Sequence, residues 1–196
     1  MKIIGLTGPT GAGKSTAARW FAARGCAVID CDALAREVVQ VGSPVLDALA
    51  AAFSSAVLSP DGSLDRAALA RLAFADAAAT ARLNSITHPA ILALVRERVE
   101  QARREGRPAA VVDAPLLYES GFDAACDAVV AVLADRAVRM ARIMARDGID
   151  EAAATARMAA QRDDAYYIGR GAVAVYNDGD ETALVAALAQ ATEEWL

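Results

Sequence analysis

One stretch decides the fold of this chain: Gly8-Pro9-Thr10-Gly11-Ala12-Gly13-Lys14-Ser15. Apolar residues 1–7 before it predict a short buried strand, and residues 14–24 after it have the apolar spacing of a helix, which Gly25 ends. A G-x-x-x-x-G-K-S turn between a strand and a helix is typical of a P-loop, because small residues let successive backbone N–H groups curl around phosphate oxygens. The weaker alternative is a tight strand–helix turn that carries an exposed lysine.

A second apolar segment at residues 27–30 follows this helix, and the two strands are expected to lie in one parallel sheet. Similar segments predict three more strands, with helices around them. The further strands are residues 109–113, 128–133 and 173–176, and the helices are residues 136–146, 151–161 and 181–196. The sequence therefore predicts an α/β P-loop NTPase fold, a five-stranded parallel sheet flanked by helices.

Residues 32–107 separate the second strand from the third and show no convincing strand signal. The helices expected there are residues 32–40, 44–53, 66–75, 77–86 and 89–105. A long helical insertion between two core strands suggests a part of the chain that covers a substrate.

Composition narrows the class of protein. A net charge of −5 argues against nonspecific nucleic-acid binding, which needs a basic surface. The three cysteines have no metal-ligand spacing and fit reduced thiols in a cytosolic protein. The first apolar run is too short for a signal peptide, and no apolar stretch is long enough to span a membrane. We therefore expect a cytoplasmic protein that binds neither nucleic acid nor a membrane.

Three acidic or hydroxyl residues are candidates for phosphate chemistry beside Lys14, which neutralises β- and γ-phosphate charge. Ser15 can offer a hydroxyl to Mg²⁺. Asp113 ends an apolar strand, as a Walker B acid does, and can reach the Mg²⁺ shell; the alternative is a buried acid that accepts loop N–H bonds. Asp32 follows the second strand, where its carboxylate can take a proton from a substrate hydroxyl; the alternative is that it caps the next helix. Arg36 shares its helix face.

The function of two further basic features stays open on the sequence alone. Arg139, Arg142 and Arg146 line one helix face and could neutralise phosphoryl charge from a closing lid, although spacing alone favours a solvated face paired with Asp135 or Asp147. His88, the only histidine, precedes Pro89 at an expected helix start, where it could cap the helix, bind an anionic ligand or act as a general base, and a structural role is favoured.

In this order, these motifs resemble the dephospho-coenzyme A kinase family over most of the chain, from Ile4 to Gly179. Besides the P-loop, the specific parts are Val28-Ile29-Asp30-Cys31-Asp32 with Ala35-Arg36, Leu64-Asp65-Arg66, His88-Pro89-Ala90-Ile91, Pro115-Leu116-Leu117-Tyr118-Glu119, and Arg142-x-x-x-Arg146-Asp147-Gly148 with Gln161. The resemblance implies a P-loop kinase that transfers the γ-phosphate of ATP to the ribose 3′-hydroxyl of dephospho-CoA, the last step of CoA synthesis.

The resemblance also implies roles for individual residues. The catalytic residues are Asp32 as base, Lys14 and Arg142. The ATP-binding residues are Gly11, Ala12, Gly13, Lys14, Ser15, Thr16, Arg142, Arg146 and Asn177. The acceptor-binding residues are Asp32, Arg36, His88, Leu116, Leu117, Tyr118 and Glu119. The metal ligands are Ser15 and, through water, Asp113.

The family pattern further implies one kinase domain with three parts. These are a core (about residues 1–31, 108–135 and 162–196), a helical acceptor-binding insertion (about 32–107) and a lid (about 136–161). The expected partners are ATP and dephospho-CoA with Mg²⁺, and the expected state is a monomer or weak homo-oligomer.

The chain departs from the family pattern in three places. Pro9-Thr10 replaces a common Gly-Ile pair, Cys31 stands where alanine is usual, and Gly171-Ala172 replaces Ala-Asp, which puts any role of that acid in doubt. None of these changes removes a group that phosphoryl transfer needs.

Three other functions stay open on the sequence alone. The first is a kinase of the same class with another small-molecule or nucleotide acceptor. The second is a regulatory nucleotide-binding NTPase, against which the chain lacks an Asn-Lys-x-Asp guanine motif. The third is a noncatalytic CoA- or nucleotide-binding module, which the retention of Lys14, Asp32 and the lid arginines disfavours.

Overall fold

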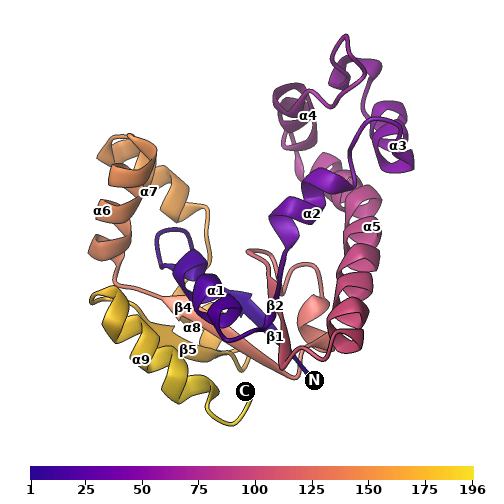
Figure 1. The fold of residues 1–196 in the computed structure, drawn as a ribbon. Coiled ribbons are helices and arrows are strands. Elements are labelled where there is room, and N and C mark those ends of the chain that lie inside the picture. The colour runs from indigo at the N-terminus through magenta and orange to yellow at the C-terminus, as the bar shows by residue number, and fades with distance from the viewer. The chain divides into compact units, whose positions relative to one another are not determined.

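Five strands form one parallel sheet in the computed structural model, which describes residues 1–196 (Figure 1). The strands are β1 (Lys2–Thr7), β2 (Ala27–Asp30), β3 (Ala109–Asp113), β4 (Ala128–Leu133) and β5 (Val173–Tyr176), in the order β2-β3-β1-β4-β5. The apolar runs of the three central strands β3, β1 and β4 are buried on both faces, as parallel strands covered by helices require, while the edge strands β2 and β5 are only partly buried. The predicted sheet is thereby confirmed, with strand bounds within one residue of those expected.

The chain divides into two compact units, residues 1–29 with 99–196, and residues 30–98. The first unit holds the sheet, except for Asp30 at the end of β2. No helix of the structure is long and apolar enough to cross a membrane.

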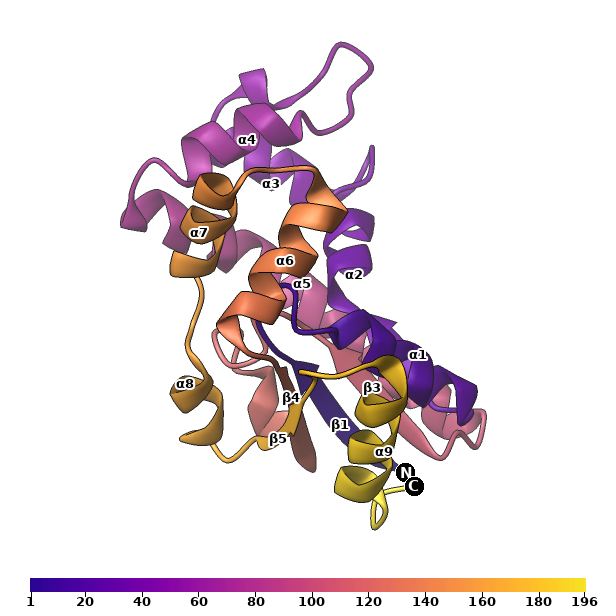
Figure 2. The ribbon, with the colours of Figure 1, turned by 90° about the vertical axis from the view of Figure 1, so that its left-hand side faces the viewer.

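Helices cover both faces of the sheet in the first unit. On one face α1 (Lys14–Ala23) and α9 (Glu181–Thr192) lie side by side (Figure 2), and Phe21 and Leu188 join the main core with Ile4 of β1. On the other face Tyr118 and Tyr167 pack against β4. The remaining elements are α6 (Arg136–Asp147), α7 (Glu151–Ala159), the short α8 (Asp164–Ile168), which the sequence did not predict, and a 3₁₀ turn, η2 (Phe122–Ala125).

The second unit is a helical assembly with its own core. It contains α2 (Cys31–Glu37), α3 (Pro44–Ala52), the 3₁₀ turn η1 (Ser55–Val57), α4 (Arg66–Ala73) and most of α5 (Ala77–Arg104). Val39, Leu49, Val57 and Leu69 are buried together at its centre. The sequence predicted no strand here, yet Leu58 and Leu64 form a single antiparallel bridge around a tight turn.

Helix α5 corrects the sequence prediction. Two helices, 77–86 and 89–105, were expected because Pro89 lacks an N–H and clashes with the preceding turn. The structure instead shows one 28-residue helix with Pro89 inside it. Apolar residues before and after the proline, such as Ile86 and Ile91, pack against the same core, so tertiary packing offsets the lost backbone hydrogen bond.

The buried position of Leu49 leads to a test of this second core. We expect Leu49→Ala to lower the free energy of unfolding by about 2–5 kcal/mol, because Leu49 is 0% exposed and its removal leaves a cavity. Leu72→Ala, at a residue 40% exposed on α4, should change it by no more than about 0.5 kcal/mol. Urea denaturation followed by circular dichroism measures both, and equal effects would contradict this assignment of the core.

Candidate active site

The loop between β1 and α1 adopts a backbone that only glycine takes easily. Gly8 has φ 141° and Gly13 has φ 103°. A Cβ on Gly8 would lie 2.2 Å from the carbonyl oxygen of Val132, and one on Gly13 would lie 2.1 Å from Nδ2 of Asn177. These two glycines therefore let the loop lie directly against β4 and the residue that follows β5.

Lys14 and Asp113 form an ion pair at this loop. Lys14 is the first residue of α1, and Asp113 is the last residue of β3. The parallel register pairs Leu6 of β1 with Asp113, so the acid lies where β1 gives way to the loop. The lysine expected to meet phosphate and the acid expected at the metal shell are thus brought together.

Asn177 supports the loop from a buried position. Its side chain is 6% exposed, and its Nδ2 donates to the carbonyl oxygen of Ala12 at 2.7 Å. Its backbone N–H donates to the carbonyl of Leu133, which aligns the end of β5 with β4. The resemblance implied that Asn177 binds ATP, and the structure places its amide against the loop backbone at Ala12 and Gly13.

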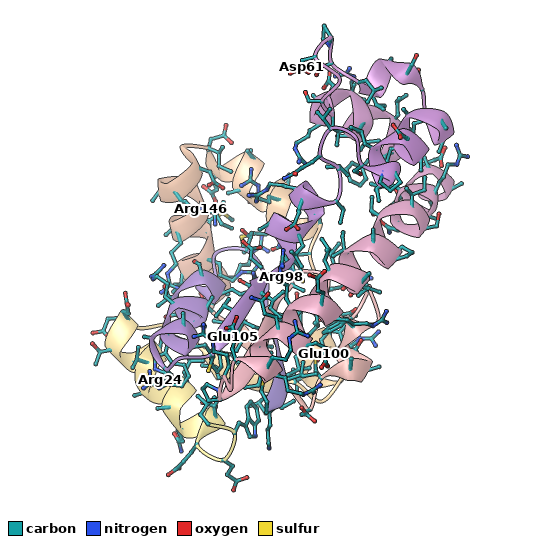
Figure 3. All side chains as sticks on the ribbon, turned by 45° about the vertical axis from the view of Figure 1, so that its right-hand side comes forward. Arg24, Asp61, Arg98, Glu100, Glu105 and Arg146 are labelled. Atoms are coloured by element: carbon teal, nitrogen blue, oxygen red, sulfur yellow. The ribbon has the colours of Figure 1, made fainter.

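The arginines of α6 lie along the same loop. Nη1 of Arg142 donates to the carbonyl oxygen of Asn177 at 2.9 Å, and Nη2 donates to that of Gly179 at 3.2 Å. Arg146, labelled in Figure 3, donates to both carboxylate oxygens of Asp147 and, at 3.3 Å, to Oγ1 of Thr10. The bond to Asp147 raises the pKa of Arg146 and lowers that of the acid.

The segment Leu116–Glu119, expected on the acceptor side, divides into buried and exposed residues. Leu117 is fully buried and Tyr118 nearly so, and burial raises the pKa of the Tyr118 hydroxyl. Leu116 is exposed, and the Glu119 carboxylate accepts a hydrogen bond from the Tyr166 hydroxyl at 3.2 Å. Leu116 is 54% exposed and the Glu119 side chain 32% exposed, while the two residues between them are buried.

Asp32 and Arg36 lie one turn apart on α2 in the second unit, and both are exposed. The cap of this helix is Asp30, whose Oδ1 accepts from the backbone N–H groups of Asp32 at 2.8 Å and Ala33 at 3.1 Å. The alternative in which Asp32 caps the helix is therefore wrong. Asp30 is the cap because α2 begins directly after β2, so the last residue of the strand becomes the N-cap of the helix.

His88 lies in the middle of α5, so it does not cap a helix start as expected. It is half-buried, and desolvation lowers its pKa below the usual 6.5. The imidazole is accordingly neutral at pH 7.

A metal would find few protein ligands in this chain. No group of three or more His, Cys, Asp or Glu side chains could hold a metal ion. The oxygen donors at the loop are the exposed Ser15 hydroxyl and the Asp113 carboxylate. Such a sparse set suits a hard cation that keeps most of its waters and is held largely by phosphate oxygens.

Sequence reasoning did not predict that Arg139 and Gln161 contact the loop. Arg139 was grouped with its neighbours by helix spacing alone, and Gln161 was only part of a resemblance. In the structure both side chains form hydrogen bonds with the backbone of Thr10. The helix spacing placed Arg139 on the correct face, but nothing in the sequence indicates that the loop lies opposite.

The parallel sheet, the glycine-rich loop between β1 and α1 and the Lys14–Asp113 pair define a P-loop protein. A family model described as dephospho-CoA kinase matches residues 2–182. The chain belongs to the dephospho-CoA kinase family, which confirms the resemblance seen in its motifs.

Curated relatives agree with this assignment, and solved structures share the fold. The chain is 50% identical to the dephospho-CoA kinase of Anaeromyxobacter dehalogenans over 82% of its length and 76% of the relative's. It is 46% identical to that of Moorella thermoacetica, over 99% and 92% of the two chains. A crystal structure from Thermus thermophilus is 32% identical and superposes with a TM-score of 0.82, over 100% and 98% of the chains. Dephospho-CoA kinase from Campylobacter jejuni, 24% identical with a TM-score of 0.72 over 98% and 96%, shares the fold.

The lowered pKa of His88 predicts a pH dependence of stability. Between its folded pKa and 6.5 the unfolded chain binds more protons, so the free energy of unfolding should fall as the pH falls from 7 through 6.5. Because this is the only histidine, one imidazole signal in a proton NMR titration reports its pKa directly.

The control for this test is His88→Gln, which should lack that part of the pH dependence in urea denaturation at the same pH values. A measured pKa at or above 6.5 would contradict the burial of the imidazole.

Proposed function

We propose that this chain transfers the γ-phosphate of ATP to the ribose 3′-hydroxyl of dephospho-CoA, giving coenzyme A in the last step of its biosynthesis. The observation that carries the proposal is a glycine-rich P-loop with the Lys14–Asp113 pair, in a chain that belongs to the dephospho-CoA kinase family. The relatives cited above are named for that activity, and they match this chain over most of its length.

On the donor side, the backbone N–H groups from Gly11 to Thr16 would surround the β- and γ-phosphates at the positive end of α1. Lys14 is placed to exchange its bond to Asp113 for a phosphate oxygen, because its ammonium already lies at the loop. Asn177 would act here through the loop backbone that it holds.

We propose Mg²⁺ as the divalent ion that accompanies ATP. Ser15 would offer its hydroxyl, and Asp113 would contact the ion through water once Lys14 turns to phosphate. When bound, the ion neutralises negative charge on the phosphates. The protein residues around it orient the triphosphate and need not form a metal site of their own.

On the acceptor side, Asp32 would orient the 3′-hydroxyl and accept its proton. Its exposed carboxylate is available because Asp30 makes the helix cap. The transition state of phosphoryl transfer is loose, so positioning and charge neutralisation supply most of the catalysis. Arg36, His88 and the Leu116–Glu119 segment would contact the rest of the acceptor.

Arg142 and Arg146 would close on the phosphates from a lid of about residues 136–161. Arg142 now donates to neutral backbone carbonyls, and bonds to phosphate oxygens would be shorter and stronger because both partners are charged. The insertion of about residues 32–107 would hold the acceptor, with the remaining residues as the core. We propose a cytoplasmic enzyme that acts as a monomer or weak homo-oligomer on these two small substrates.

The assay that tests this function supplies purified protein with ATP, Mg²⁺ and dephospho-CoA. We expect a product phosphorylated on the 3′-hydroxyl, identified by phosphorus NMR. Phosphorylation of a different acceptor would make the chain another kinase of its class. ATP hydrolysis that does not depend on any acceptor would indicate a regulatory NTPase.

Asp32→Asn separates the chemical step from nucleotide binding. We expect turnover to fall by at least about 100-fold, because the amide cannot accept the proton, while the dissociation constant for ATP stays within about twofold. Steady-state kinetics and calorimetry measure the two effects. Glu37→Gln, a neutralised carboxylate on the same helix, is the matched control and should keep its turnover. Normal turnover in Asp32→Asn would remove Asp32 from the role of base.

A further inference from the structure

A closed set of three hydrogen bonds holds the tip of the P-loop. Nε of Arg139 donates to the carbonyl oxygen of Thr10 at 3.0 Å. Nη2 of Arg139 donates to Oε1 of Gln161 at 3.0 Å, and that same oxygen accepts the backbone N–H of Thr10 at 3.0 Å. Both polar groups of the Thr10 backbone are therefore bound to side chains more than a hundred residues away in sequence.

Arg139 occupies an unusual position for a cation. It is 7% exposed, and desolvation lowers its pKa. Its two partners in the set are neutral oxygens, so no carboxylate in direct contact compensates for the buried charge. The backbone of α6 also lies close to the loop, since a Cβ on Gly11 would lie 2.8 Å from the carbonyl oxygen of Arg139.

The same side of the loop shows a repeated pattern. The carbonyl oxygen of Thr10 accepts from Arg139, that of Gly11 from Arg142 at 3.4 Å, and that of Ala12 from Asn177 at 2.7 Å. A loop that turns N–H groups toward an anion turns carbonyl groups away from it, and those carbonyls need donors of their own. Three successive carbonyls are satisfied in this way, each by a different side chain.

We propose that Arg139 and Gln161 are positioning residues that hold the tip of the P-loop in its phosphate-binding shape before ATP arrives. Gln161 also fixes one end of the phosphate cradle, because it takes the N–H of Thr10, which is then not offered to the triphosphate. This inference rests on the proposed role of the loop as the ATP site.

The test uses Gln161→Met, which keeps the length of the side chain and removes the oxygen that accepts both bonds. Gln161 is exposed, so the fold should stay intact. We expect ATP to bind about tenfold more weakly by calorimetry without acceptor, the effect of losing two hydrogen bonds that pre-order the loop. KM for ATP should rise to the same extent, while kcat at saturating ATP stays within about threefold, since bound triphosphate then orders the loop.

Two variants serve as controls. Gln161→Glu keeps an acceptor oxygen for Thr10 and Arg139 and should restore ATP binding to within about threefold of the original protein. Gln190→Met makes the same replacement at an exposed residue of α9 and should bind ATP normally. In ATP-free protein, hydrogen exchange at the Thr10 amide should be faster in Gln161→Met and unchanged in Gln190→Met.

Normal ATP binding by Gln161→Met would overturn the inference, and so would weakened binding with unchanged exchange at Thr10. Equal weakening in Gln190→Met would also overturn it, because the effect would not depend on the loop. If the original protein itself binds no ATP, the proposed function fails instead. Arg139→Lys gives a second test, since an ammonium lacks the planar fork with which Nε and Nη2 reach the two oxygens, and it should weaken ATP binding where Arg136→Lys at an exposed position does not.

Discussion

The structure of the first unit depends on one constraint, that a backbone loop which presents N–H groups to an anion must have its carbonyl groups satisfied on the other side. The glycines at positions 8 and 13 supply the backbone angles. The carbonyls are then bound by side chains from α6 and from the residue after β5. A P-loop is therefore more than its own eight residues, because its shape requires donors from distant parts of the chain.

The parallel sheet brings those parts together. Neighbouring parallel strands end at the same edge, so the residues that follow β1, β3 and β5 meet there. Asp113 ends β3, Asn177 directly follows β5, and Lys14 begins α1 after the loop; the Lys14–Asp113 pair and the bond from Asn177 to Ala12 join these segments. Sheet order thus decides which distant residues can support the loop.

The sequence predicted the strands and the P-loop well, because both depend on local properties. Each strand is a short apolar run that must be buried, and the loop pattern is itself the structure. The continuity of α5 could not be predicted, since Pro89 is tolerated only because residues on either side of it pack on one core. The sequence could not tell which aspartate caps α2 for a similar reason. Asp30 and Asp32 are both good caps, and the exact end of β2 selects between them.

The three arginines of α6 show where spacing stops being informative. Their common face suggested one shared role, either in solvent or in a lid. In the structure Arg139 is buried against Thr10, Arg142 binds carbonyls beyond β5, and Arg146 pairs with Asp147. The periodicity of a helix determines which residues share a face, but it does not determine their partners, which are Thr10 far earlier in the chain, Asn177 after β5, and the adjacent Asp147. A buried arginine that supports the loop and an exposed one that pairs with a neighbouring acid therefore have the same signature in sequence, and only the burial of each guanidinium separates them.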